Sequence, residues 1–188
     1  MAVTGMALAF LPATAHAEKG LGHCVLDLPA GSMSCYGTFT EAIAAATNGR
    51  VTTVPNDVHK AQDDPALKAY LAAQVAAADC PQGGKDGCIL SIEYEDEDFD
   101  DSTLTSRGPF TCSGPITDID YELPQMPPGW NDQIDSFRSS TDNFGPLAGL
   151  CYVQHFEHSN FQGGWIGPSP TTAHMGGMGD QTSSIRWT

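Results

Sequence analysis

Two stretches of sequence decide the fold: Asn131-Asp132-Gln133-Ile134-Asp135-Ser136 and Gly179-Asp180-Gln181-Thr182-Ser183-Ser184. Each polar hexapeptide lies downstream of two aromatic residues five positions apart, Tyr94 and Phe99 before the first and Phe156 and Phe161 before the second. Aromatic side chains at this spacing can pack on each other across a tight folded hairpin, in which a small residue permits a positive φ angle. The hexapeptides then offer carboxylate, amide and hydroxyl oxygens, the kind of ligand that hard divalent cations such as calcium prefer.

The paired pattern resembles the βγ-crystallin domain, a family in which Y/F-x4-F-x-G marks each Greek key and N/D-N/D-x-x-S/T-S binds calcium. The resemblance covers residues 88–188, and the second hairpin matches its motif fully from Phe156 to Gly163. The sequence departs from the family pattern at Asp101, where Gly is expected, at Asp135, where Ser or Thr is usual, and at Gly179, where Asn or Asp is usual. These departures bear on the number and affinity of calcium sites more than on the fold.

The resemblance also implies a ligand set for one or two calcium ions. Its members lie in the two hexapeptides, or directly after the first aromatic residue of each hairpin, where the family supplies a backbone carbonyl. They are Asn131, Asp132, Gln133, Asp135, Asp180, Gln181 and Ser183, with the carbonyls of Glu95 and Glu157. Ser136 and Ser184 are predicted to brace the turns by hydrogen bonds. The alternative is that both hexapeptides are ordinary turns, because Asx turns need no metal.

The second half of the chain is predicted to be mainly β. From Cys88 onward, short β-prone runs alternate with dense turn residues, and Leu150 to Phe156 alternates apolar and polar side chains as a half-buried strand should. Predicted strands cover residues 88–94, 116–121, 134–137, 150–156, 165–166 and 185–187. The predicted fold class is therefore a βγ-crystallin-like Greek-key β-sandwich over residues 88–188, preceded by a small helical, disulfide-braced N-terminal region over residues 18–87.

Two helices are predicted in this N-terminal region. Thr38 and Glu41 form a capping box before an Ala-rich helix, and Asn48-Gly49 is a stop signal. Asp64 as N-cap and Pro65 at the first helical position begin a second helix that continues to Ala78. A β-prone run occupies residues 50–54. The region is too small to bury a large core, so we expect it to pack on the following domain or to bind a partner.

Residues 1–17 are predicted to be a secretory signal peptide. They form a short apolar run that ends in Ala15-His16-Ala17, which fits an A-x-A cleavage pattern. The apolar run is too short to span a membrane. We therefore expect a secreted protein without a membrane span.

The six cysteines agree with export, because disulfides persist in oxidising compartments. Pairing between neighbours predicts three bridges, Cys24–Cys35, Cys80–Cys88 and Cys112–Cys151, although six cysteines allow other connectivities. Free or metal-bound thiols are the alternative, but the chain has no C-x2-C pair of the kind found in zinc ribbons.

The formal charge of −15 argues against nucleic-acid partners and anionic membrane surfaces, and it permits cations or a basic protein partner. Seven acids crowd one segment: Glu93, Glu95, Asp96, Glu97, Asp98, Asp100 and Asp101. Such a cluster repels itself unless a cation or a basic partner neutralises it. A solvated acidic loop is the simpler interpretation of the cluster alone.

No motif of a known enzyme class is present, so a non-enzymatic protein is predicted. Two alternatives to calcium binding remain. Family analogy suggests a secreted protease inhibitor or a killer-toxin-like antimicrobial protein, with the loop Thr105 to Gly114 or the Cys24–Cys35 segment as the contact. Residues 18–87 could instead be a partner-binding module carried by the β-domain. A zinc site at His155 and His158 is disfavoured, because positions three apart on a strand point to opposite faces.

Overall fold

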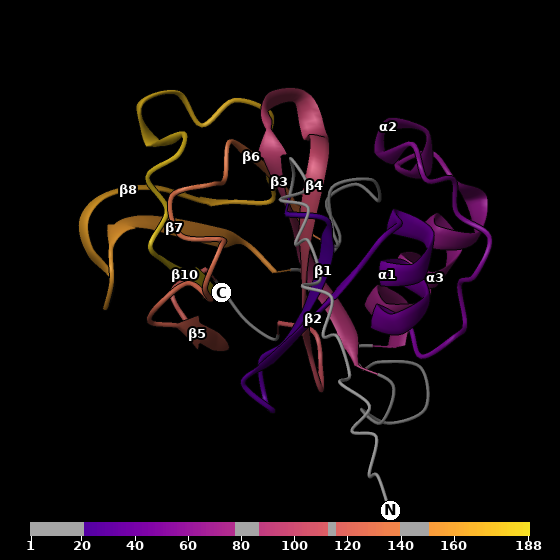
Figure 1. Cartoon of the computed structure of the whole chain (residues 1–188). Coiled ribbons are helices and arrows are strands. Elements are labelled where there is room, and N and C mark those ends of the chain that lie inside the picture. The colour runs from indigo at the N-terminus through magenta and orange to yellow at the C-terminus, as the bar shows by residue number, and fades with distance from the viewer. Residues whose placement is uncertain (1–20, 78–86, 113–115, 140–150) are drawn as a thin grey trace, which may run out of the picture.

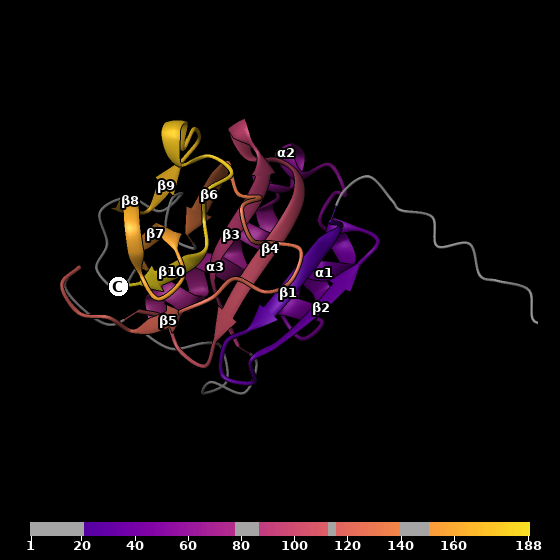
Figure 2. The ribbon, with the colours of Figure 1, turned by 60° about the vertical axis from the view of Figure 1, so that its left-hand side comes forward.

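The computed structural model describes residues 21–77, 87–112, 116–139 and 151–188. Two β-sheets pack face to face, and helices cover the outer face of the larger sheet, so that the molecule has three layers (Figure 1). The larger sheet has six strands in the order β2-β1-β4-β3-β6-β9, and the smaller sheet has four in the order β5-β10-β7-β8. Figure 2 shows β1 and β2 continuing the larger sheet beyond β4.

The strands of the larger sheet are β1 (His23–Asp27), β2 (Ser32–Tyr36), β3 (Cys88–Asp96), β4 (Asp100–Gly108), β6 (Ser136–Ser139) and β9 (Thr171–Thr172). Those of the smaller sheet are β5 (Tyr121–Leu123), β7 (Val153–His158), β8 (Gln162–Ser169) and β10 (Ser184–Trp187). The helices are α1 (Phe39–Ala46), α2 (Val58–Ala61) and α3 (Pro65–Ala77), with 3-10 turns η1 (Glu97–Phe99) and η2 (Gly176–Met178).

The strand order describes two interlocked Greek keys. Each repeat begins with a hairpin, β3–β4 in the first and β7–β8 in the second, and returns its last strand to lie beside the first, β6 beside β3 and β10 beside β7. The third strand of each repeat crosses to the other sheet, so β5 pairs with β10 and β9 pairs with β6. Because each repeat completes the sheet of the other, the two fold as one sandwich.

The N-terminal region is only partly helical, which corrects the prediction for residues 18–87. It opens with the β1–β2 hairpin, and β1 pairs in parallel with β4, so that this hairpin extends the sheet of the first Greek key. The hairpin was missed because β2 is a polar, largely exposed edge strand without hydrophobic alternation. The β-prone run at residues 50–54 forms no strand, since Val51 and Val54 are buried among the helices instead.

Both predicted helix starts are present. The Thr38 hydroxyl accepts a hydrogen bond from Glu41 N at 3.2 Å and donates one to the Glu41 carboxylate at 3.0 Å. The Asp64 carboxylate accepts from Ala66 N and Leu67 N at 2.9 and 3.0 Å, ahead of α3. Asn48 and Gly49 both adopt positive φ directly after α1, which ends that helix as expected.

Two hydrophobic cores separate the three layers. The core between the sheets contains Trp130, Phe137 and Trp187, and the core between the helices and the larger sheet contains Phe39 and Ile43. Strand β3 lies between the two cores and is buried on both faces from Cys88 to Tyr94, so its polar residues Ser91 and Glu93 are buried as well.

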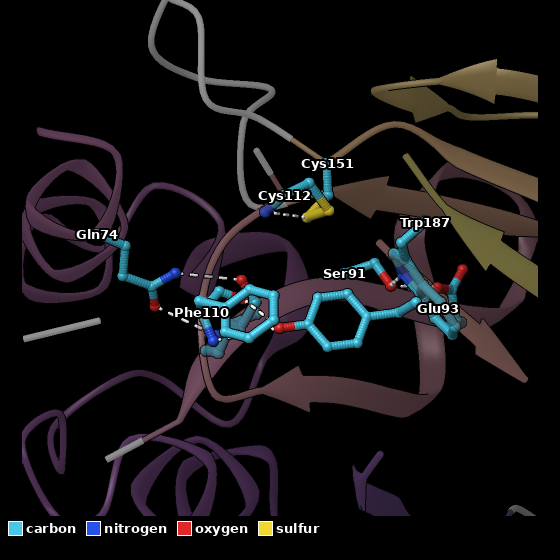
Figure 3. The surroundings of a disulfide bond; sticks show 9 residues. Gln74, Ser91, Glu93, Phe110, Cys112, Cys151 and Trp187 are labelled. Atoms are coloured by element: carbon cyan, nitrogen blue, oxygen red, sulfur yellow. Dashed lines mark hydrogen bonds between the residues drawn. A yellow bond between two sulfur atoms is a disulfide. The ribbon is translucent and has the colours of Figure 1, made fainter. Parts of the chain in front are cut away.

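Two of the three predicted disulfides, Cys24–Cys35 and Cys112–Cys151, are present. The first joins paired residues of β1 and β2. The second ties the loop after β4 to the start of the second repeat, beside Phe110 (Figure 3). The predicted Cys80–Cys88 bridge involves Cys80, which lies outside the described residues, as does the predicted signal peptide. Among the helices that the structure describes, none is long and apolar enough to cross a membrane.

Candidate calcium site

The two aromatic hairpins have the same geometry. The rings of Tyr94 and Phe99 meet edge to face with centroids 5.6 Å apart, and those of Phe156 and Phe161 do the same at 5.6 Å. The backbone has positive φ at three equivalent positions of each hairpin: 98, 99 and 101 in the first, and 160, 161 and 163 in the second. Asp101, at φ 63°, therefore adopts the conformation that Gly163 adopts at φ 82°. The departure at Asp101 leaves the turn intact.

An arginine closes each hairpin, which sequence reasoning missed. The Arg138 guanidinium lies 3.8 Å from the centroid of Phe99, and the Arg186 guanidinium lies 3.9 Å from that of Phe161. Both arginines stand two residues after the final serine of a hexapeptide, so the repeated spacing was the available signal. Cation–π contacts of this kind stabilise each corner of the fold.

The final serines brace the turns as predicted. The Ser136 hydroxyl donates to Asp96 O at 2.6 Å and accepts from Phe99 N at 3.1 Å. The Ser184 hydroxyl donates to His158 O at 2.7 Å and accepts from Phe161 N at 3.0 Å. Each hexapeptide is thereby fixed to the hairpin turn of its own repeat.

The two hexapeptides also lie against each other. Asp132 N donates to Thr182 O at 3.0 Å, and Asp180 N donates to Ile134 O at 3.2 Å, so the contact is reciprocal. Asp132 and Asp180 occupy equivalent positions with φ of 58° and 53°. The structure thus brings together, around one approximate two-fold axis, two loops that are far apart in the sequence.

On one side of this axis lies a group of carboxylates that we call site A. Two come from the turn between β3 and β4, one from the first hexapeptide and one from the second; they are Asp96, Glu97, Asp135 and Asp180. The pKa of the Asp135 carboxyl is raised by burial and then by the negative charges of Asp180, Glu97 and Asp96. The pKa of Asp96 is raised by burial and then by neighbouring carboxylates, including Asp180 and Glu97. The four groups therefore repel one another in the absence of a cation.

His174 contacts the edge of site A. Its Nδ1 lies 3.2 Å from a Glu97 carboxylate oxygen, and its Nε2 lies 3.2 Å from one of Asp98. Asp98 N also donates to Ala173 O at 2.9 Å, which joins this segment to the β3–β4 turn. Figure 2 shows the β3–β4 turn and the short yellow helix η2 at the same end of the molecule.

The equivalent positions on the other side of the axis form site B, which carries far less charge. They are His158, Ser159, Ser183 and Asp132. The Ser183 hydroxyl donates to an Asp132 carboxylate oxygen at 3.3 Å, and the Asn131 amide donates to the other at 2.6 Å. Site B therefore offers one carboxylate where site A offers four.

At the predicted carbonyl positions, the side chains of Glu95 and Glu157 make different contacts. One Glu95 carboxylate oxygen is buried without a hydrogen-bond partner among the described residues. The Glu157 carboxylate accepts from Gly164 N at 2.8 Å and so closes its own hairpin. Of the two glutamines, the Gln133 side chain donates to Asp132 O, while Gln181 N donates to Met178 O. Sequence reasoning missed Asp96 and Glu97 as candidate ligands, although the dense acidic run was a signal.

Gly179 is explained by a neighbouring carboxylate. A Cβ atom added at position 179 would lie 2.2 Å from Asp135 Oδ1, although the backbone there, at φ −55° and ψ 137°, suits any residue. The missing side chain leaves the space that the Asp135 carboxylate fills. Carboxylate oxygens are of the kind that hard cations take as ligands. Across the described part of the chain, no three His, Cys, Asp or Glu side chains are already arranged as a metal-binding group.

A buried polar network connects the second hexapeptide to the core. His155 Nδ1 lies 3.3 Å from the Thr182 hydroxyl, and His155 Nε2 lies 3.3 Å from the Glu93 carboxylate. The Glu93 carboxylate also accepts from Ser91, whose hydroxyl accepts from the Trp187 indole at 2.8 Å (Figure 3). His155 is fully buried whereas His158 is exposed.

No family model and no curated protein matches the sequence. Solved structures that match include the N-terminal domain of protein S (15% identity, 53% of this chain and 94% of that chain, TM-score 0.36) and a βγ-crystallin from an archaeon (17%, 54% and 99%, 0.35). A double mutant of a βγ-crystallin domain from Clostridium beijerinckii also matches (18%, 53% and 97%, 0.36). At these TM-scores, the matches add no argument about function. The strand order and paired turns define a mainly β fold of the βγ-crystallin type.

Proposed function

We propose that the protein is an exported, non-enzymatic protein that binds calcium through its paired hexapeptide loops, and that calcium stabilises its fold. The observation that carries this proposal is the reciprocal contact between the two hexapeptides beside four mutually repelling carboxylates. A divalent cation between these groups would relieve the repulsion and link both Greek keys. Export is supported by the two described disulfides.

The size of the effect follows from mass action. An ion that binds only the native state at a hundredfold excess over its Kd adds about 2.7 kcal/mol to the free energy of unfolding. Extracellular calcium modules have Kd values of about 10⁻⁴–10⁻³ M. Calcium at about 10 mM is therefore a hundredfold excess at the tight end of this range.

Thermal unfolding of residues 18–188 in EDTA, in calcium and in magnesium tests the proposal. We expect a rise in Tm with calcium that magnesium does not reproduce. Asp132→Asn combined with Asp180→Asn removes a carboxylate from each loop and should abolish the rise while leaving the Tm in EDTA unchanged or higher. Equal Tm values in EDTA and calcium would instead identify the hexapeptides as turns without a metal.

The loop from Thr105 to Gly114 gives less support to the alternative function, protease inhibition. Thr105 to Gly108 belong to β4, which pairs with both β1 and β3. Phe110 is half-exposed, but its N and O atoms are both bonded to the Tyr121 hydroxyl, at 3.2 and 2.7 Å. Its main chain is therefore occupied and cannot pair with a protease cleft as an extended substrate would.

A further inference from the structure

We propose that one calcium ion binds with high occupancy, at site A, and that the exchange of side-chain bulk between Asp135 and Gly179 makes site A the stronger of two unequal sites. This inference rests on the proposed function, because it states which of the two loops holds the ion and why. Asp135 and Gly179, the two departures from the hexapeptide pattern, are paired: the larger side chain at one position fills the space left by the smaller one at the other.

The side chains at positions 135 and 179 match in size. Position 135 in site A is equivalent to Ser183 in site B, and position 179 is equivalent to Asn131. Site B therefore has a long side chain at 131 and a short one at 183, and site A has the reverse. Since a Cβ at 179 would lie 2.2 Å from Asp135 Oδ1, any other residue at 179 would force the Asp135 carboxylate out of its position.

Sites A and B differ in their number of carboxylates. Asp96 and Glu97 of site A correspond to His158 and Ser159 of site B. In site B, moreover, Asn131 and Ser183 donate to both oxygens of the single Asp132 carboxylate, which reduces the charge available to an ion. Calcium affinity rises with the number of charged oxygen ligands, so we expect site A to bind at least about tenfold more tightly than site B.

The backbones of the two loops are held by equivalent hydrogen bonds. Asp135 is fixed at both ends of its peptide unit, because its N donates to Tyr94 O at 3.1 Å and its O accepts from Met175 N at 3.0 Å. Ser183 is held in the same way by Phe156 O and Met126 N, each at 2.9 Å. The two loops thus have the same frame, and the difference between the sites lies in their side chains.

Isothermal titration calorimetry with calcium on residues 18–188 measures the stoichiometry. We expect one ion per chain in the tight phase. Asp135→Ser should weaken this phase at least about tenfold, and by more than the matched change Asp132→Asn in site B. Two equivalent ions, or a greater loss with Asp132→Asn, would overturn the inference while preserving calcium binding. No binding by any variant would overturn the proposed function itself.

Transfer of the exchange to site B provides a gain-of-function test. Asn131→Gly with Ser183→Asp gives site B a second carboxylate and should tighten its calcium binding, and Ser183→Asp alone should do so less because Asn131 occupies the space. If the double variant still binds one ion with wild-type affinity, the exchange does not determine site strength.

A metal-free measurement tests the packing argument separately. In EDTA, Gly179→Ala should lower the Tm of the wild-type protein, and it should lower it less in the Asp135→Ser background, where the 3.2 Å approach to Gly176 O remains. Equal losses of Tm in both backgrounds would show that Gly179 is required for a reason other than the Asp135 carboxylate.

Discussion

Asp101 has a positive φ angle in the first hairpin. The equivalent position of the second hairpin is Gly163. An L-residue in the left-handed region is strained, and Asp101 also raises the pKa of Asp96 through its charge. Asp101→Gly should therefore stabilise the protein by about 0.5–1 kcal/mol, measured by urea unfolding in EDTA. Asp101→Asn, which removes the charge and keeps the side chain, is the control. A glycine variant no more stable than the asparagine variant would contradict the strain argument.

The buried pair Glu93 and His155 occupies equivalent positions of the two repeats, each one residue before the first aromatic of its hairpin. Both side chains are fully buried, and their closest atoms lie 3.3 Å apart without forming a well-aligned hydrogen bond. Replacing His155 leaves the buried Glu93 carboxylate without its imidazole partner, so His155→Leu should cost about 3–5 kcal/mol. Adding Glu93→Leu should recover much of that loss, because it removes the unpaired carboxylate. Strictly additive costs in the double-mutant cycle would show that the two groups do not interact.

At the scale of the element, the β3–β4 turn and the hexapeptides predict an unusual pH dependence. The pKa values of Asp96 and Asp135 are raised in the folded protein above the ordinary 3.8, so the folded state binds more protons than the unfolded state just above that pH. Their contribution to stability therefore falls as pH rises through this window. In EDTA, the Tm of the wild type relative to Asp135→Asn should decrease as the pH rises above the ordinary carboxyl pKa of 3.8. Parallel Tm curves for the two proteins would contradict this prediction. In saturating calcium, the Tm of the wild type relative to Asp135→Asn should instead increase with pH.

The elements also show what the sequence could and could not predict. The aromatic hairpins, helix caps and the strands β3, β6, β7, β8 and β10 were predictable, because spacing and local chemistry encode them. Strands β4 and β9 were not predicted, and the strand predicted at residues 116–121 overlaps β5 only at Tyr121. The β1–β2 hairpin was not predictable, since β1 gains its place by parallel pairing with a strand some 80 residues away and β2 has a polar pattern. Trp165 is 58% exposed on the edge strand β8, although large aromatic side chains are usually buried. The relation between Asp135 and Gly179 appears only when the folded repeats bring the two loops together.

At the scale of the whole molecule, the helices and the β1–β2 hairpin complete the larger sheet. Ile89 and Ile92 of β3 pack in the same core as Phe39, Leu67 and Leu71 of the helices. The buried Gln74 side chain of α3 also bonds Ile89 N and O, at 3.2 and 3.1 Å, where β3 departs from regular pairing with β4. The larger sheet therefore depends on the N-terminal region for its apolar cover, for an edge strand and for part of its hydrogen bonding.

A fragment of residues 88–188 should consequently fail to behave as a stable carrier domain. Removing the helices exposes a broad apolar sheet face, and removing β1 leaves β4 as an unpaired edge, both of which favour aggregation. Size-exclusion chromatography and circular dichroism should find the fragment aggregated or partly unfolded, while residues 18–188 remain monomeric and unfold cooperatively. Ile89→Ser with Ile92→Ser in the fragment is the matched control, since it should restore solubility if the apolar face is responsible. A soluble, cooperatively folding 88–188 fragment would show that the double Greek key is self-sufficient and would make residues 18–87 the place to search for a partner.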